Sequence, residues 1–143
     1  MTAKDLSELS MLELFRAEVE NQAPLLTAGL LALERDPEAA DQLEACMRAA
    51  HSLKGAARIV DIAAAVGVAH AMEDCFVAAQ EGRLRLRQGH IDLLLGGVDL
   101  LARFAHSPEM DPLDSPQAKA FAEALESAMQ DNGQSDPALD AAA

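Results

Sequence analysis

One histidine of the chain, His51, lies in an alanine-rich stretch that also contains a lysine and a glycine. The stretch AAHSLKGAARIV covers residues 49–60, so Lys54 follows the histidine by three positions and Gly55 by four. Histidine is among the side chains that form covalent phosphoryl intermediates. A neighbouring lysine would stabilise a phosphoryl group, which brings about −1.5 to −2 charges. The stretch therefore suggests phosphoryl transfer at His51.

The charge around His51 has the opposite sign to that of the whole chain. The 143 residues hold 24 acidic and 11 basic side chains, a formal net charge of −13. Residues 48–58 nevertheless contain three basic residues and no acidic one. At about 100° per residue, Arg48, Gly55 and Arg58 share a helix face with His51. This face suits an anion, and Gly55, which has no side chain, leaves room for a partner protein to bind there.

A carboxylate falls within the apolar stripe of the next helical segment. Glu73 lies on the side formed by Ile62, Ala65, Val66, Ala69, Met72 and Phe76. An unpaired buried carboxylate is costly, so Glu73 needs a donor. His51, at the edge of its own stripe, is one candidate, and a structural bridge from Arg58 is the alternative. A bond from Nδ1 of His51 would fix the tautomer whose Nε2 lone pair points outward as a nucleophile.

Other polar residues of the two segments leave more than one interpretation open. Lys54 either stabilises the phosphoryl group or is a solvated charge, and His70 either supports the site or is a surface residue. His70 and Glu73 have an i, i+3 spacing, but di-metal bundles need two Glu-x-x-His units. Within the five predicted helices only one such pair, in reversed order, is present, so we expect no metal site. His90 and His106 are assigned no role. A purely structural helical domain would leave the basic patch and the carboxylate unexplained.

Composition and periodicity favour an all-α fold. Aromatic residues make up 3% of the chain, whereas Ala, Leu and Glu, which are good helix formers, abound. Apolar residues at helical spacing, separated by Pro, Gly and turn residues, predict five helices, over residues 6–33, 37–60, 62–80, 88–106 and 117–130. The first four would form an antiparallel four-helix bundle, with the fifth helix packed alongside.

Prolines and glycines mark the expected boundaries. Pro24 makes the first segment either one bent helix, which we favour, or two short ones. Pro37 is placed in the first turn of the second helix, with Asp36 as its N-cap. Residues 107–116 contain three prolines and predict a loop. Residues 131–143 have no apolar period and are expected to form a disordered tail, which leaves residues 1–130 as one domain.

The charge and the lack of a long apolar segment limit the expected partners. An acidic chain is repelled by nucleic acid and by anionic membranes, so neither is expected to bind. No apolar run reaches the ~18 residues that a membrane span needs, and the first ten residues do not resemble a signal peptide. Cys46 and Cys75 lack the spacing of metal or redox sites and are interpreted as reduced packing residues. These features predict a cytoplasmic domain with protein partners.

The motifs that contain these residues resemble those of the histidine phosphotransfer (HPt) domain of CheA-type chemotaxis kinases. That family carries HS[IL]KGxA in one helix and HxxE in the next; here AAHSLKGAARIVDI is followed by HAMED. The resemblance covers about residues 7–106 and implies a four-helix bundle, with a fifth helix in the CheA-type branch. It also implies that His51 is phosphorylated, that Glu73 orients it, and that Lys54 and His70 support it.

The function implied by the resemblance is that of a phosphoryl carrier in two-component signalling. A separate kinase domain would move the phosphoryl group from ATP to His51, and an aspartate of a response-regulator receiver domain would then accept it. The sequence has neither a P-loop nor a glycine-rich nucleotide lid, so ATP and Mg²⁺ would belong to the partner domains and this chain would need no cofactor.

The wider organisation of the protein leaves alternatives. The chain is expected to be a monomeric piece of a protein-histidine kinase; the alternative is a stand-alone phosphorelay HPt that shuttles between receiver domains. After the lysine the sequence continues GAARI, where CheA-type domains often have GG and an aromatic residue, and Pro24 is unusual in the first helix. These departures leave the subfamily open to a chemotaxis-like system such as the Wsp surface-sensing type.

Overall fold

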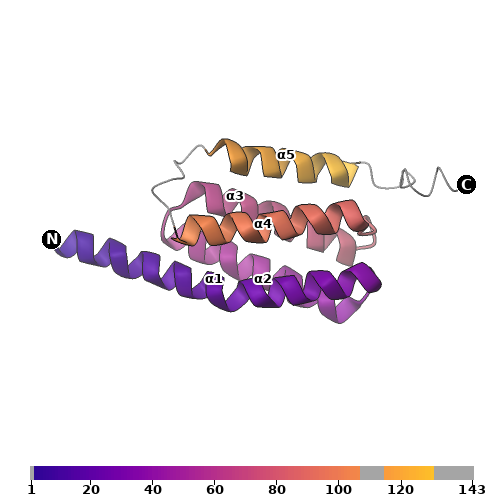
Figure 1. The fold of residues 1–143 in the computed structure, drawn as a ribbon, viewed down its shortest axis with the longest axis horizontal. Helices are drawn as coiled ribbons and strands as arrows, with labels where there is room; N and C mark the ends of the chain where they lie inside the picture. The colour runs from indigo at the N-terminus through magenta and orange to yellow at the C-terminus, as the bar shows by residue number, and fades with distance from the viewer. Residues whose placement is uncertain (1, 107–114, 131–143) are drawn as a thin grey trace, which may run out of the picture.

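Five helices make up almost all of the part of the chain that the computed structural model describes, residues 2–106 and 115–130. They are α1 (Ala3–Arg35), α2 (Ala40–Ile59), α3 (Ala63–Gln80), α4 (Gln88–His106) and α5 (Pro116–Gln130). Helices α1 to α4 form an antiparallel bundle, and α5 lies along one side of it (Figure 1). The expected all-α fold is confirmed. The predicted loop at 107–116 and the predicted tail at 131–143 lie almost entirely outside the described residues.

The packing order of the helices places the core between all four members of the bundle. Helix α1 contacts α2 and α4, α2 contacts α3, and α3 contacts α4. The fifth helix packs on α3 and α4. The largest fully buried side chains include Phe15, Leu30, Leu53, Phe76 and Leu101. Because these side chains come from all four helices of the bundle, the helices share a single core.

Helix α1 is continuous through its proline. Thr2 and Asp5 form a capping box, with the Asp5 amide donating to the Thr2 hydroxyl at 3.1 Å. Pro24 lies inside the helix, where it removes one backbone hydrogen bond. Figure 1 shows α1 changing direction partway along its length. One bent helix, rather than two short ones, is therefore confirmed.

The expected start of α2 is wrong. Asp36 is the C-cap of α1, with its amide donating to the Ala32 carbonyl at 3.0 Å, and its carboxylate accepts from the amide of Glu38 at 3.2 Å. Pro37 lies in the resulting turn, and α2 begins three residues later, after Ala39, which provides no side-chain cap. Asp36 serves the end of one helix and the turn after it, and so does not cap the next helix.

The connection between α2 and α3 is short and tightly bonded. The amide of Asp61 donates to the Arg58 carbonyl and the amide of Ile62 to the Ala57 carbonyl, both at 3.1 Å. This pair of bonds is the Schellman motif, which needs a residue in the left-handed region. Asp61 has φ = 60°, a conformation that aspartate tolerates better than most residues. The motif fixes where α3 begins relative to α2.

The position of α5 depends on a glycine and a histidine of α4. A Cβ added to Gly97 would lie 2.7 Å from the Phe121 ring and 2.8 Å from Sδ of Met72, so the glycine allows α5 to approach. His90 is buried; its Nδ1 accepts the amide hydrogen of Arg87 at 2.9 Å, and its Nε2 lies 3.1 Å from the Ala128 carbonyl. Because Nδ1 accepts, Nε2 donates. His90, which sequence reasoning left without a role, ties α4 to α5.

Candidate functional site

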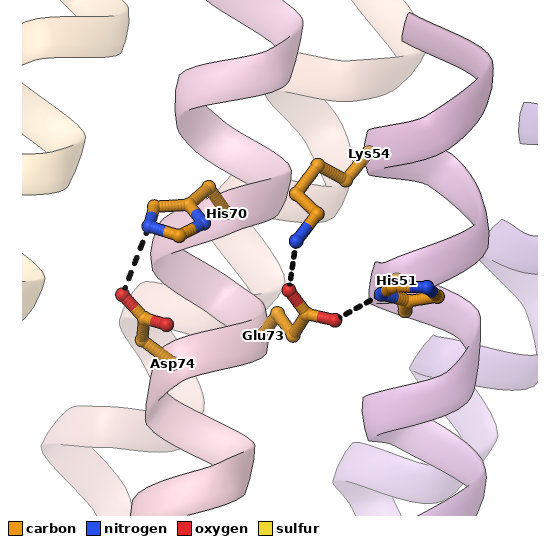
Figure 2. Close-up of polar contacts among 5 residues, drawn as sticks. All are labelled: His51, Lys54, His70, Glu73 and Asp74. Atoms are coloured by element: carbon orange, nitrogen blue, oxygen red, sulfur yellow. Dashed lines mark hydrogen bonds and ion pairs between the residues drawn. The ribbon is translucent and has the colours of Figure 1, made fainter. Parts of the chain in front are cut away.

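His51 and Glu73 face each other across the seam between α2 and α3 (Figure 2). Nδ1 of His51 is hydrogen-bonded to Oε2 of Glu73. The histidine side chain is 67% exposed, whereas that of Glu73 is only 11% exposed. The Glu73 carboxylate therefore lies between the helices, and the imidazole extends from it toward solvent. The structure confirms the predicted burial of Glu73 and its predicted contact with His51.

Lys54 binds the second oxygen of the same carboxylate. Its Nζ lies 2.5 Å from Oε1 of Glu73, and its side chain is 13% exposed. Lys54 begins one turn after His51 and turns inward, so that both side chains reach α3 from the same helix (Figure 2). The interpretation of Lys54 as a solvated charge is wrong, and so is the alternative of an Arg58 bridge to Glu73.

The two partners keep Glu73 ionised in spite of its burial. Burial raises the pKa of this carboxyl, but hydrogen bonds from Lys54 and His51, together with the charge of the lysine, lower it more. The pKa of Glu73 is therefore held below its usual range. An ionised carboxylate accepts hydrogen bonds and donates none, so the proton of the His51 bond lies on Nδ1. Nε2 then carries the free lone pair on the exposed side of the ring.

The basic patch expected around His51 is weaker than the sequence suggests. Arg48 is paired with Glu44, one turn earlier on α2, at 2.8 Å. Arg58 is exposed. Gly55 is also exposed, and an added Cβ would meet nothing within 4 Å. The packing of this chain therefore does not explain the glycine, and the surface beside His51 is open.

His70 does not join the contacts of His51. Its Nε2 lies 3.2 Å from Oδ2 of Asp74, one turn later on α3, and both side chains are about half exposed. Figure 2 shows this pair on the other side of α3 from the bond between His51 and Glu73. The structure thus places His70 beside the site, paired with Asp74 and apart from the bonds that join His51, Lys54 and Glu73. Within residues 2–106 and 115–130, no group of three or more His, Cys, Asp or Glu side chains is arranged to hold a metal ion.

A polar contact next to His51 was not foreseen from the sequence. The Ser52 hydroxyl donates to Oε1 of Glu18 on α1 at 2.8 Å, and the Gln22 side chain donates to the same oxygen at 2.7 Å. The Ser52 bond ties α2 to α1 at the residue that follows the histidine, and the Gln22 bond, within α1, holds the Glu18 side chain. Helical periodicity alone gives no signal for them, because Glu18 is one of many carboxylates on α1.

The remaining sequence predictions concern thiols and membranes. Cys46 and Cys75 are free and buried, and burial raises the pKa of each thiol to about 12. Both are therefore packing residues, as expected. Among the helices of the described residues, none has the combination of length and apolarity required to cross a bilayer.

Comparison with known proteins agrees with this geometry. The sequence matches the Hpt domain family over residues 10–105. It is 32% identical over 101 residues to the chemotaxis protein CheA of Borreliella burgdorferi, and 31% identical over 103 residues to that of Treponema pallidum. These alignments cover 71% and 72% of this chain but only 12% and 13% of the relatives, so this chain spans a small part of the length of those proteins.

A solved structure shows the same fold. The phosphorylated P1 domain of CheA3 from R. sphaeroides, in complex with CheY6, superposes with a TM-score of 0.74 at 20% identity. The match covers 85% of this chain and 96% of that domain. The family match extends over most of the bundle and includes both motifs around His51 and Glu73. The chain belongs to the Hpt domain family and is of the CheA type.

Proposed function

We propose that this chain carries a phosphoryl group on Nε2 of His51. The observation that supports this most is that the two sides of the imidazole lie in different environments. Nδ1 is held by the buried Glu73, while the ring itself is 67% exposed. A histidine held in this way has one nitrogen fixed as a donor and the other free to attack phosphorus.

The chemistry follows from the tautomer. The Nε2 lone pair attacks the γ-phosphorus of ATP held by a separate kinase domain, the bond to the leaving ADP oxygen breaks, and an N–P bond forms. Nδ1 keeps its proton, so the ring becomes positively charged, and the ionised Glu73 stabilises that charge through the hydrogen bond. An aspartate of a receiver domain then attacks the same phosphorus, the N–P bond breaks, and the imidazole returns neutral.

The surface beside His51 supports the approach of those partners. Gly55 is exposed and leaves open space where a side chain would project. Glycine in a helix interior costs up to about 1 kcal/mol relative to alanine, and no close packing within the described residues offsets that cost. Close approach of a partner to His51 would explain the glycine. Arg48 and Arg58, both exposed on α2, are the charged residues that a receiver or kinase domain would meet there.

The partners and location follow from this chemistry. ATP and Mg²⁺ would be bound by the kinase domain, and the phosphoryl group would pass to a receiver domain such as the CheY6 present in the related complex. We place the domain in the cytoplasm, where ATP and receiver domains are found. The alternative, a stand-alone phosphorelay carrier, differs in its donor, which would be a phosphorylated receiver.

Phosphorylation of purified variants tests the proposal. The chain is incubated with a CheA kinase domain and radiolabelled ATP, or with a phosphorylated receiver. His51→Gln should abolish the acid-labile label with both donors, while far-UV circular dichroism stays the same because the side chain is mostly exposed. His70→Gln is the matched control and should keep most of the label. Labelling that persists in His51→Gln would exclude it as the acceptor, and the preferred donor decides between kinase fragment and phosphorelay carrier.

A further inference from the structure

Helix α1 has an apolar outer face that none of the other four described helices covers. Of the five large apolar side chains exposed in the described part of the chain, four are leucines of α1: Leu6, Leu14, Leu25 and Leu31. Leu14 is 69% exposed and Leu25 is 60% exposed. Eleven residues separate these two, which is close to three full turns, so they lie on the same face of the helix.

The strip of α1 through Leu14, Ala17, Asn21, Leu25 and Ala28 is exposed and carries no charge. Exposed Glu20 borders this strip on the side of Leu31. Charged side chains on the flanks of α1 form hydrogen bonds to the neighbouring helices. Arg16 donates to the Ala105 carbonyl of α4 at 3.2 Å, and Glu18 accepts from Ser52 of α2 at 2.8 Å. In a chain of net charge −13, this uncharged strip repels a second acidic molecule less than the charged surface beside it does.

The arrangement of large and small residues on this face is symmetrical about Asn21. Leu14 lies seven residues before it and Ala28 seven residues after it; Ala17 lies four before and Leu25 four after. In an antiparallel pair of α1 helices centred on Asn21, each leucine would meet an alanine of the second copy. Large residues packed against small ones are the arrangement that lets helices interdigitate.

We propose that the outer face of α1 is a self-association surface, on which a second copy of this chain packs antiparallel about a two-fold axis near Asn21. The strip from Leu14 to Leu31 is about 26 Å long and about 10 Å wide, given 1.5 Å per residue and the diameter of a helix. It is small compared with the ~800 Å² per partner of a stable complex. The dimer is therefore weak and concentration-dependent, and it forms in equilibrium with the monomer expected from the sequence.

Pairing through α1 leaves the candidate site accessible. His51 and Glu73 lie on the seam between α2 and α3, to which α1 does not belong. Two copies joined at α1 therefore carry two separate acceptor histidines, each open to a kinase or receiver domain. The self-association surface and the phosphoryl-acceptor site are independent, and a variant in one should leave the other unchanged.

Sedimentation equilibrium of the 143-residue chain over a wide concentration range tests the surface. The wild type should show a reversible monomer–dimer equilibrium. Leu14→Glu and Leu25→Glu should each raise the dissociation constant at least about tenfold, a change of ~1.4 kcal/mol, with unchanged helicity because both side chains are exposed. Ile59→Glu is the matched control, since Ile59 is an exposed apolar residue of α2, and it should sediment as the wild type.

Disulfide crosslinking tests the antiparallel arrangement. Asn21→Cys should crosslink to the second copy under mild oxidation because it lies near the axis, whereas Leu14→Cys should not, because it faces Ala28 of the second copy. The native cysteines are buried and should not compete. A chain that sediments as a monomer at every concentration, or a dimer that both glutamate variants leave intact, overturns the proposal. Equal crosslinking at positions 14 and 21 overturns the antiparallel pairing.

Discussion

Lys54 and His51 are joined through one carboxylate: the lysine binds Oε1 of Glu73 and the histidine binds Oε2. The three groups come from adjacent turns of two helices. The positive charge of Lys54 compensates the negative charge of Glu73, so the carboxylate stays ionised between the helices. Because it stays ionised, it holds the imidazole as the Nδ1–H tautomer. Lys54 is in this sense a positioning residue, which acts on His51 through Glu73.

Replacing Lys54 should slow the acceptor without abolishing it. Lys54→Ala removes one partner of Glu73 and weakens its control of the His51 tautomer, so phosphorylation should slow about 3-fold to 10-fold, or ~0.7 to 1.4 kcal/mol in the barrier. The loss should persist at high salt, because the Lys54 side chain is only 13% exposed and buried pairs are screened little. An effect that disappears in high salt would mean that Lys54 acts as a surface charge.

Removing the carboxylate should have the larger effect. Glu73→Ala should slow phosphorylation about 10-fold to 100-fold, the ~1.4 to 2.8 kcal/mol expected for a lost charge-assisted hydrogen bond. Nitrogen-resolved NMR of the imidazole should show the Nδ1–H tautomer losing population in the variant. Unaltered tautomer populations would contradict the proposed activation of His51, even if the residue were still phosphorylated.

The same substitution should also destabilise the fold. Sequence reasoning alone predicts little cost for Glu73→Ala, because His51 keeps access to water. The structure reverses this expectation, since the mostly buried Lys54 would lose its partner. We expect the free energy of unfolding to fall by about 1 to 3 kcal/mol, the penalty of leaving such a group unpaired. Urea denaturation measures it, and the double variant Glu73→Ala/Lys54→Met should recover part of the loss.

Acid should weaken the wild type more than a variant without the carboxyl. The pKa of Glu73 is lower in the folded protein than its ordinary value of 4.5, so between the two values the unfolded state binds more protons than the folded state. Stability contributed by Glu73 is therefore complete above about pH 4.5 and is lost as the pH falls through the lowered value. Urea denaturation from pH 6 to pH 3 should show a steeper decline for the wild type than for Glu73→Gln. Parallel curves would contradict the lowered pKa.

Two adjacent glycines of α4 should respond in opposite directions to alanine. Gly97→Ala places a methyl group within 3 Å of Phe121 and Met72, and overpacking of this kind costs about 1 to 3 kcal/mol. Gly96 is exposed, with nothing within 4 Å of an added Cβ, so Gly96→Ala should stabilise the helix by up to ~1 kcal/mol. Thermal denaturation of both variants tests the close approach of α5, and two melting temperatures that shift the same way would argue against it.

Filling the open space beside His51 should slow phosphotransfer with partner domains and leave the stability of the fold unchanged or higher. Gly55→Leu adds a side chain on the exposed face of α2 and improves its helix propensity, so the melting temperature should hold or rise. Phosphotransfer from the kinase domain and to the receiver should nevertheless fall about tenfold or more, or ~1.4 kcal/mol. Gly96→Leu on α4 is the matched control and should transfer normally. Normal transfer by Gly55→Leu would show that partners do not approach this face.

The parts of the site that could be predicted are those set by angular position on a helix. His51 at the edge of one stripe and Glu73 within another follow from about 100° per residue, and the cost of burying a carboxylate requires a donor. The direction of Lys54 does not follow. Its long flexible side chain starts between the apolar stripe and the exposed face, and can extend either way. Only the position of the α3 carboxylate decides that it turns inward.

The errors in the predicted fold have a similar cause. Asp36 and Pro37 are residue types that often begin a helix, but Asp36 instead ends α1. The local sequence does not say which of these two roles the aspartate takes. The role of His90 could not be predicted from the sequence, because its second partner is the Ala128 carbonyl, 38 residues away. Contacts of that kind depend on how α5 packs, which periodicity within a single helix does not report.

The Schellman turn at Asp61 allows the site to form early in folding. His51 and Glu73 are 22 positions apart, with Lys54 between them, on one helical hairpin, and the turn between the helices is closed by its own backbone hydrogen bonds. Contacts of low sequence separation close small loops and form early. The acceptor and its carboxylate can thus meet as soon as α2 and α3 pair, before α4 and α5 have been added. The contact between His51 and Glu73 therefore depends on the α2–α3 hairpin alone. The other helices of the bundle cover the inner side of that hairpin and exclude water from it.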